Sequence, residues 1–196
     1  MRIYLIRHGE SADDIENCYG GIADFPLTDR GRDQAREVGV ALAGDGIEAL
    51  YSSPLARARE SAELIAEQWD TELSVSVVDE LQERNSYGVL SGVNKERAKE
   101  IFGRVLGALK EPPGFSREPL VGAEDFDDFV RRVQSALGAV VADTQARGLQ
   151  RVAVVTHGKF TQALFQCVWG LRAEDVKLGA INVVDYEPPR AVLVSS

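Results

Sequence analysis

The sequence predicts an α/β fold of three layers, in which helices cover both faces of a doubly wound, mostly parallel sheet. Short apolar runs alternate along the chain with longer segments whose apolar residues recur at helical spacing. Two of the apolar runs also end alike, in Arg7-His8-Gly9 and in Thr156-His157-Gly158. Because the carboxyl ends of parallel strands share one edge of a sheet, we expect His8 and His157 to meet there.

The first half of the chain is expected to hold three strands and two helices. The strands are predicted at residues 3–6, 47–51 and 73–78. One helix should run over 29–43, capped by Thr28 and ended by the glycines at 44 and 46. The next should include Pro54 in its first turn. The polar stretch 10–24 is expected to be irregular, since it has no apolar face to bury.

The second half is expected to hold a lid and the closing elements. Residues 85–122 have weak periodicity, a short helix near 94–102 and a break at Glu111-Pro112-Pro113-Gly114, and we interpret them as a lid or insert. A long helix from 123 carries one apolar stripe, made of Phe126, Phe129, Val130, Val133, Leu137 and Val141. Strands at 151–155, 181–186 and 191–194 and a helix at 159–169 complete a single predicted domain, 1–196.

Composition excludes several classes of protein. The chain of 196 residues is 44% apolar and 27% charged, as in an ordinary globular protein. Its formal charge of −9 argues against nucleic-acid binding, and no run approaches the roughly 20 apolar residues that span a membrane. Cys18 and Cys167 are too few for a disulfide framework, and the charged N-terminus lacks a signal-peptide core, so we expect a cytoplasmic protein.

Five side chains near predicted strand ends suit phosphoryl transfer. A neutral imidazole such as His8 is a good nucleophile near neutral pH. A phosphoryl group in transfer spreads its charge over three oxygens, so the site needs cationic donors. Arg7 and Arg57 can supply paired N–H groups, and a protonated His157 would add a third cation. Glu83 can protonate the leaving oxygen and later activate water, so no metal is required.

Four segments carry a resemblance to a known family: Arg7-His8-Gly9-Glu10-Ser11, Asp24-Phe25-Pro26-Leu27-Thr28 with Gly31 and Gln34-Ala35, Ser52-Ser53-Pro54-Leu55-Ala56-Arg57-Ala58, and Val155-Thr156-His157-Gly158. They resemble the motifs of the histidine phosphatase superfamily, also called the phosphoglycerate mutase-like family. The resemblance implies that His8 is the phosphorylated nucleophile. It also implies that Arg7, Arg57 and His157 bind phosphate, that Glu83 donates the proton, and that the enzyme uses no cofactor or metal.

One segment is similar to the cofactor-dependent phosphoglycerate mutases in particular. Residues 83–95 resemble their E-R-H-Y-G-x-L-x-G-x-N-K pattern, although the segment is one residue longer and lacks the histidine. The mutase pattern has W-N where this chain has Asp13-Asp14, and N-R where it has Asn17-Cys18. The tandem arginines that mutases use for a second phosphate have no match. We therefore expect hydrolysis of a phosphomonoester, with Asp14 repelling a phosphate if it faces the pocket.

Six further residues are candidates for substrate binding. Gly20 and Gly21, together with Asn17, follow the nucleophile and could offer backbone N–H groups to phosphate, although a plain loop is an equal alternative. Asn94 and Lys95 could approach an outer anionic group, whereas the alternative for Asn94 is a helix cap. Gly158 completes the second His-Gly pair.

Four functional hypotheses remain open from the sequence. The first is a phosphatase acting on a small phosphorylated metabolite, and the second is a mutase. The third is a module that binds a phosphorylated ligand without turnover. The fourth is a metallohydrolase that uses both histidines with Asp13, Asp14 or Glu10. The sequence leaves a homodimer open.

Overall fold

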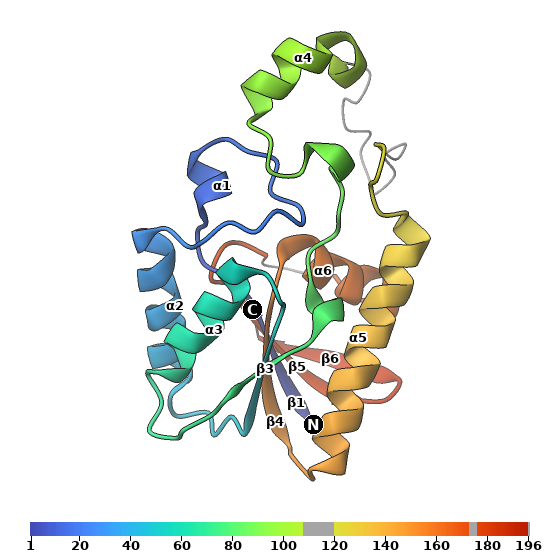
Figure 1. Cartoon of the computed structure of the whole chain (residues 1–196). Coiled ribbons are helices and arrows are strands. Elements are labelled where there is room, and N and C mark those ends of the chain that lie inside the picture. The colour runs from blue at the N-terminus through green and yellow to red at the C-terminus, as the bar shows by residue number, and fades with distance from the viewer. Residues whose placement is uncertain (108–119, 173–175, 196) are drawn as a thin grey trace.

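The computed structural model describes residues 1–107, 120–172 and 176–195 (Figure 1). Within them, one sheet has the strand order β3-β2-β4-β1-β5-β6. The strands are β1 (Arg2–Arg7), β2 (Ala49–Ser52), β3 (Val75–Val77), β4 (Arg151–Thr156), β5 (Ile181–Glu187) and β6 (Arg190–Ser195). The first four strands run parallel, while β5 and β6 pair antiparallel to their neighbours. The prediction of a mostly parallel sheet is confirmed.

Helices cover both faces of this sheet (Figure 1). Helices α2 (Asp29–Leu42) and α3 (Ala56–Ala66) pack on one face, and α5 (Phe126–Ala146) and α6 (Gly158–Ala163) on the other. Strand β1 contributes side chains to the hydrophobic cores on both faces of the sheet, because side chains alternate along a strand. Ile3 and Leu5 pack in the core with α5, whereas Tyr4 and Ile6 pack in the core with α2. The doubly wound arrangement is therefore the one predicted.

A third group of elements lies above the carboxyl edge of the sheet (Figure 1). It consists of α1 (Ala12–Ile15), the 3₁₀ turns η1 (Asp79–Leu81) and η2 (Gly88–Leu90), and α4 (Lys95–Gly107). Backbone hydrogen bonds join the loop after β1 to the segment before α4: Tyr19 N donates to Val93 O over 3.0 Å, and Gly92 N donates to Tyr19 O over 2.7 Å. The break expected at Glu111-Pro112-Pro113-Gly114 lies outside the described residues.

The structure corrects several predicted boundaries. The stretch 10–24 is not wholly irregular, because the Asp14 carboxylate accepts the Ser11 backbone N–H over 3.0 Å and starts α1. Pro54 precedes α3 rather than lying in its first turn. The long helix begins at Phe126 instead of 123, since the Asp125 side chain caps it there. The helix after β4 continues from α6 into a π-helical segment, η3 (Leu164–Trp169). No helix among the described residues is long and apolar enough to cross a membrane.

Candidate active site

The ends of three neighbouring strands build the candidate site. His8 follows β1, His157 follows β4 and Ser53 follows β2, and the sheet order places these strands side by side. The two imidazole rings have centroids 5.0 Å apart and are inclined at 60°. Both rings are buried. The prediction that the two histidines meet at the carboxyl edge of the sheet is confirmed.

Two contacts define the tautomer of His8. Its Nδ1 lies 2.7 Å from the carbonyl oxygen of Gly9, which can only accept, so Nδ1 carries the proton. On the other side of the ring, Nε of Arg57 donates to Nε2 over 3.3 Å. Burial, followed by the charges of Arg57 and Arg7, holds the pKa of His8 well below its ordinary value. The ring is therefore neutral, with its nucleophilic lone pair on Nε2.

The turn after His8 is held by backbone contacts that require glycine. Gly9 N donates to Ser61 Oγ over 3.1 Å. A Cβ on Gly9 would lie 2.9 Å from the Cα of Gly31, a contact that real side chains do not make. Ser61 lies one helical turn beyond Arg57 and donates to its carbonyl oxygen over 2.7 Å. One serine thus connects the turn after His8 to the helix that carries Arg57.

Arg57 fixes the loop that follows His8. Its Nη1 donates to Ala23 O and its Nη2 to Gly21 O, both over 2.8 Å. The guanidinium is buried, and burial lowers its pKa, an effect that Asp13 and Glu83 oppose. Arg57 therefore lies between His8 and a set of carboxylates, where it can orient an anion against Nε2 of His8.

Two buried nitrogen atoms beside the histidines lack a partner in the part of the chain that the structure describes. They are Nε of Arg7 and Nδ1 of His157. Nη1 of Arg7 donates to Val176 O over 2.6 Å, and its guanidinium carbon would lie only 3.3 Å from a Cβ on Gly158. Glycine at 158 thus lets Arg7 lie beside the second histidine. An unpaired buried N–H costs about 1–3 kcal/mol, so this pair is suited to a bound anion.

His157 is neutral rather than cationic in the unliganded protein. Burial, followed by the charges of Arg57, His8 and Arg7, holds the pKa of His157 well below its ordinary value. The expectation that a His157 protonated beside a phosphate adds a third positive charge stays a prediction. It can still serve the site as a hydrogen-bond donor through Nδ1.

Glu83 lies at the first turn of α6, directly beyond the second histidine. Its carboxylate accepts the backbone N–H of Arg84 over 2.8 Å, of Lys159 over 3.1 Å and of Phe160 over 3.2 Å. These bonds bring Glu83 to the segment that carries His157, and its charge acts on Arg57. The carboxylate predicted from sequence thus lies in the same electrostatic environment as the phosphate-binding candidates.

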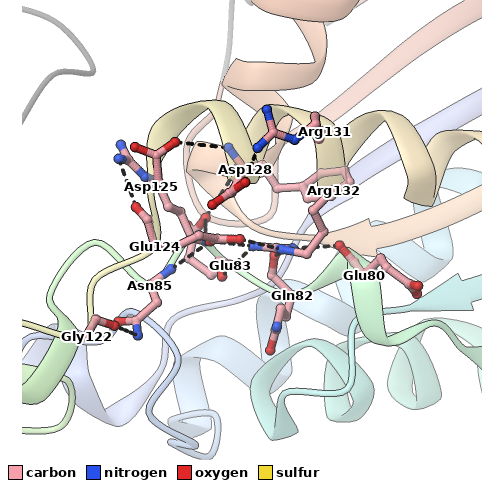
Figure 2. Close-up of polar contacts among 12 residues, drawn as sticks. Glu80, Gln82, Glu83, Asn85, Gly122, Glu124, Asp125, Asp128, Arg131 and Arg132 are labelled. Atoms are coloured by element: carbon pink, nitrogen blue, oxygen red, sulfur yellow. Dashed lines mark hydrogen bonds and ion pairs between the residues drawn. The ribbon is translucent and has the colours of Figure 1, made fainter. Parts of the chain in front are cut away.

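A single arginine on α5 holds the segment that carries Glu83 (Figure 2). Arg132 donates through Nη1 to the carbonyl oxygens of Glu80 (2.7 Å) and Gln82 (2.8 Å), and through Nη2 to that of Glu83 (3.3 Å). Its Nε and Nη2 also pair with the Glu124 carboxylate over 2.7 and 2.8 Å. Both partners of this ion pair are largely buried, so its loss would leave several acceptors unpaired.

We expect Arg132→Lys to lower the free energy of unfolding by about 2–3 kcal/mol, because an ammonium cannot reach three carbonyls and a carboxylate together. Arg131→Lys is the matched control. Arg131 is the adjacent residue, and it is exposed and forms a surface ion pair with Asp128, so its change should stay within about 0.5 kcal/mol. Denaturant unfolding of both variants measures the free energy of unfolding. Equal losses in the two variants would contradict the stabilising role of the Arg132 contacts.

The other predicted binding residues lie in the junction between the loop after β1 and the segment before α4. Asn94 caps α4, since its Oδ1 accepts Glu96 N over 3.0 Å and Arg97 N over 3.3 Å, which confirms the alternative of a helix cap. Asn17 has a φ of 54° and its carbonyl accepts Lys95 N over 2.9 Å. The side chains of Asn17 and Lys95 are exposed, and within the described residues neither side chain hydrogen-bonds to a histidine.

Asp13, rather than Asp14, is the acidic residue that approaches the site. Asp14 is exposed and its carboxylate is engaged by Ser11 at the start of α1. Asp13 is half-buried, accepts Ser11 Oγ over 2.6 Å and lies directly over Gly20, where any side chain would collide with its carboxylate. Among charged groups, Asp13 acts most strongly on Arg57. The repulsion that the sequence suggested for Asp14 therefore belongs to Asp13.

We expect the Asp13→Asn variant to bind orthovanadate about three- to fivefold more tightly than the wild type. The substitution removes a negative charge near Arg57 but keeps a side chain of nearly the same size. Glu37→Gln on α2 removes the same charge from an exposed position and should leave binding unchanged. Inhibition of aryl phosphate hydrolysis measures the vanadate affinity of each protein. Weaker binding to Asp13→Asn would mean that the carboxylate helps to bind the anion.

The fourth hypothesis, a metallohydrolase, needs a set of metal ligands. In residues 1–107, 120–172 and 176–195, no group of three or more His, Cys, Asp or Glu side chains is placed to hold a metal ion. The carboxylates of Asp13 and Asp14 instead accept hydrogen bonds from Ser11.

Sequence reasoning gave no role to Ser53, Ser61 or Arg132, and it did not place Asp13 beside Arg57. Ser53 and Ser61 contact the two histidine segments, Asp13 faces Arg57, and Arg132 holds the Glu83 segment. The spacing of four between Arg57 and Ser61 on one helix was a usable signal. Arg132 gave none, because it lies far along the chain from the segment that it holds.

The fold and the site together define an α/β protein in which two buried histidines and two arginines meet at the carboxyl edge of a mostly parallel sheet. The family model described as "Histidine phosphatase superfamily (branch 1)" matches residues 3–196. The chain belongs to this superfamily.

Relatives and solved structures within this superfamily include both mutases and phosphatases. The chain is 30% identical to a 2,3-bisphosphoglycerate-dependent phosphoglycerate mutase of Azorhizobium caulinodans, over 89% of this chain and 84% of that protein. A solved Escherichia coli protein, provisionally described as an alpha-ribazole-5'-P phosphatase, has a TM-score of 0.81 at 26% identity, covering 98% and 94%. Phosphoglycerate mutase from Bacillus anthracis shares the fold, with a TM-score of 0.82 at 22% identity, covering 100% and 92%.

Proposed function

We propose that this chain is a cytoplasmic, metal-independent phosphatase that hydrolyses a small phosphomonoester through a phosphohistidine on His8. The observation that carries the proposal is the tautomer of His8, whose Nδ1–H is bound by Gly9 and whose Nε2 lone pair faces Arg57. The unpaired buried nitrogens of Arg7 and His157 support an anion at the same place. The E. coli phosphatase, at 26% identity, supports hydrolysis as a chemistry of this fold.

The proposed reaction has two steps, each an in-line displacement at phosphorus. In the first, Nε2 of His8 attacks, the bond from phosphorus to the ester oxygen breaks, and protonated Glu83 gives its proton to that oxygen. In the second, Glu83 takes a proton from water as the water oxygen attacks phosphorus, and the bond from phosphorus to nitrogen breaks. Arg7, Arg57 and Nδ1–H of His157 stabilise the negative charge of the equatorial oxygens in both steps.

A mutase is the second candidate, because the A. caulinodans relative bears that name and residues 83–95 resemble the mutase pattern. A mutase must hold a doubly phosphorylated intermediate, and Asp13 places a negative charge near Arg57 where a second anionic group would be disfavoured. This arrangement favours a substrate with one phosphate.

A panel of phosphomonoesters that includes both phosphoglycerate isomers separates the two candidates. The proposal predicts release of inorganic phosphate, with little exchange between 2- and 3-phosphoglycerate when a bisphosphoglycerate primer is present. Isomer exchange faster than phosphate release would establish the mutase. Binding of phosphorylated ligands with neither activity would establish the third hypothesis, a binding module.

We expect Glu83→Gln to lower kcat for alkyl phosphates by about 10²-fold or more, because an alkoxide leaves slowly without a proton donor. With 4-nitrophenyl phosphate, whose leaving group needs no proton, the variant should keep a rapid burst of nitrophenol and then stall as phosphoenzyme. Glu80→Gln is the control, since the Glu80 side chain is exposed and only its carbonyl contacts Arg132. An equal loss for both substrates, with no burst, would contradict the acid–base role.

A further inference from the structure

We propose that the hydroxyl of Ser53 sets the tautomer of His157, so that the neutral ring directs its Nδ1–H at the phosphoryl group. This positioning role rests on the proposed function, because it concerns how His157 serves phosphoryl transfer. Ser53 belongs to the segment between β2 and α3, and no motif reasoning gave it a task.

The geometry around Ser53 leaves its proton one destination. The residue is fully buried, and its backbone N–H donates to Val155 O over 3.0 Å, which fixes it beside the end of β4. Its Oγ accepts the N–H of Leu55 over 3.3 Å and lies 2.7 Å from Nε2 of His157. Within the described residues this hydroxyl has no other hydrogen-bond partner, so its proton is directed to Nε2.

The opposite tautomer of His157 would leave two buried polar groups, the Ser53 hydroxyl and Nδ1 of His157, without a favourable hydrogen bond. If Nε2 of His157 carried the proton and donated to Ser53, the serine hydroxyl would have no acceptor within the described structure. The buried Nδ1, which already lacks a partner there, would then turn a lone pair toward the anion. Buried polar groups are rarely left unpaired, so both consequences favour the proton on Nδ1.

The tautomer of His157 determines which of its ring nitrogens donates a hydrogen bond, because the ring is neutral. Four groups from surrounding elements act electrostatically on His157: Arg57 on α3, His8, Arg7 at the end of β1, and Arg132 on α5. With burial, they keep the pKa of His157 well below its ordinary value. An imidazolium would donate from both nitrogens, whereas a neutral ring donates from only one. The serine therefore decides whether this ring donates to a phosphate or repels it.

The direct test is the ¹⁵N spectrum of the resting wild-type protein labelled at histidine. The chain has two histidines and therefore four ring nitrogens, and His8→Ala removes two of the signals for assignment. The proposal expects a protonated Nδ1 and an unprotonated Nε2 on His157. A protonated Nε2 with an unprotonated Nδ1 would overturn it. This measurement needs no turnover, so it stands apart from the failure of the proposed phosphatase activity.

A pair of adjacent serine variants tests the consequence for catalysis. Ser53→Ala should lose about 10- to 100-fold in kcat/KM for an aryl phosphate at neutral pH, and the loss should shrink at lower pH as protonation of His157 restores Nδ1–H. Ser52→Ala is the control, because Ser52 is equally buried but its hydroxyl donates to the Ser53 carbonyl. Equal activity of the two variants, or a loss that does not change with pH, would overturn the proposal.

Discussion

Replacing His8 with alanine is expected to lower kcat for an aryl phosphate by at least about 10³-fold. The substitution removes the nitrogen whose lone pair faces Arg57, and no other neutral imidazole offers a free lone pair at that position. Without the nucleophile, hydrolysis would have to proceed by direct attack of water on the phosphomonoester, without the covalent intermediate that divides the reaction into two easier steps. Initial rates of nitrophenol release from the purified variant measure the effect.

The variant must be shown to fold before its loss of activity is interpreted. His8 lies at the end of β1, and its ring contacts Gly9 and Arg57 rather than the apolar cores on either face of the sheet. We therefore expect cooperative thermal unfolding close to that of the wild type. Full activity in a folded His8→Ala protein would show that another group accepts the phosphoryl group.

Arg57→Lys is expected to lower kcat/KM by about 10²-fold or more, although the positive charge is kept. The guanidinium serves three acceptors at once: Ala23 O, Gly21 O and Nε2 of His8. A lysine ammonium cannot reproduce this planar fork, so the loop after the nucleophile loses its support and the anion loses a paired donor. Steady-state kinetics with an aryl phosphate give the size of the loss.

The matched control for this prediction lies on the same helix. Arg59 is two residues further along α3 and is exposed to solvent. Arg59→Lys should leave kcat/KM within about twofold of the wild type. If Arg57→Lys and Arg59→Lys behaved alike, the buried guanidinium would have no part in the reaction and the phosphate pocket would have to be placed elsewhere.

The strand pattern predicted the place of the site better than its details. His8 and His157 each end a short apolar run, and that observation sufficed to predict that they meet, because parallel strands share a carboxyl edge. Thr28 was found as the cap of α2 because its side-chain chemistry is local to the helix that it starts. Features that depend on residues close together in the sequence could thus be predicted from it.

Features that depend on contacts distant in sequence were not. Arg132 donates to carbonyl groups about 50 residues away in the chain, and no sequence pattern in either segment predicts this contact. Asp13 and Asp14 are adjacent and both accept hydrogen bonds from Ser11, and only the turn of α1 decides that Asp13 is the one near Arg57. The neutral state of His157 likewise follows from burial among cations that come from separate elements.

Trapping the covalent intermediate tests the central claim most directly. A ³²P-labelled phosphomonoester is mixed with the wild-type protein and with His8→Ala, and each reaction is quenched in alkali within milliseconds. The account predicts labelled wild-type protein whose label is stable in alkali, is lost in acid and maps to His8, with no label on the variant. Turnover by the wild type without such an intermediate, or a label that maps to another residue, would contradict it.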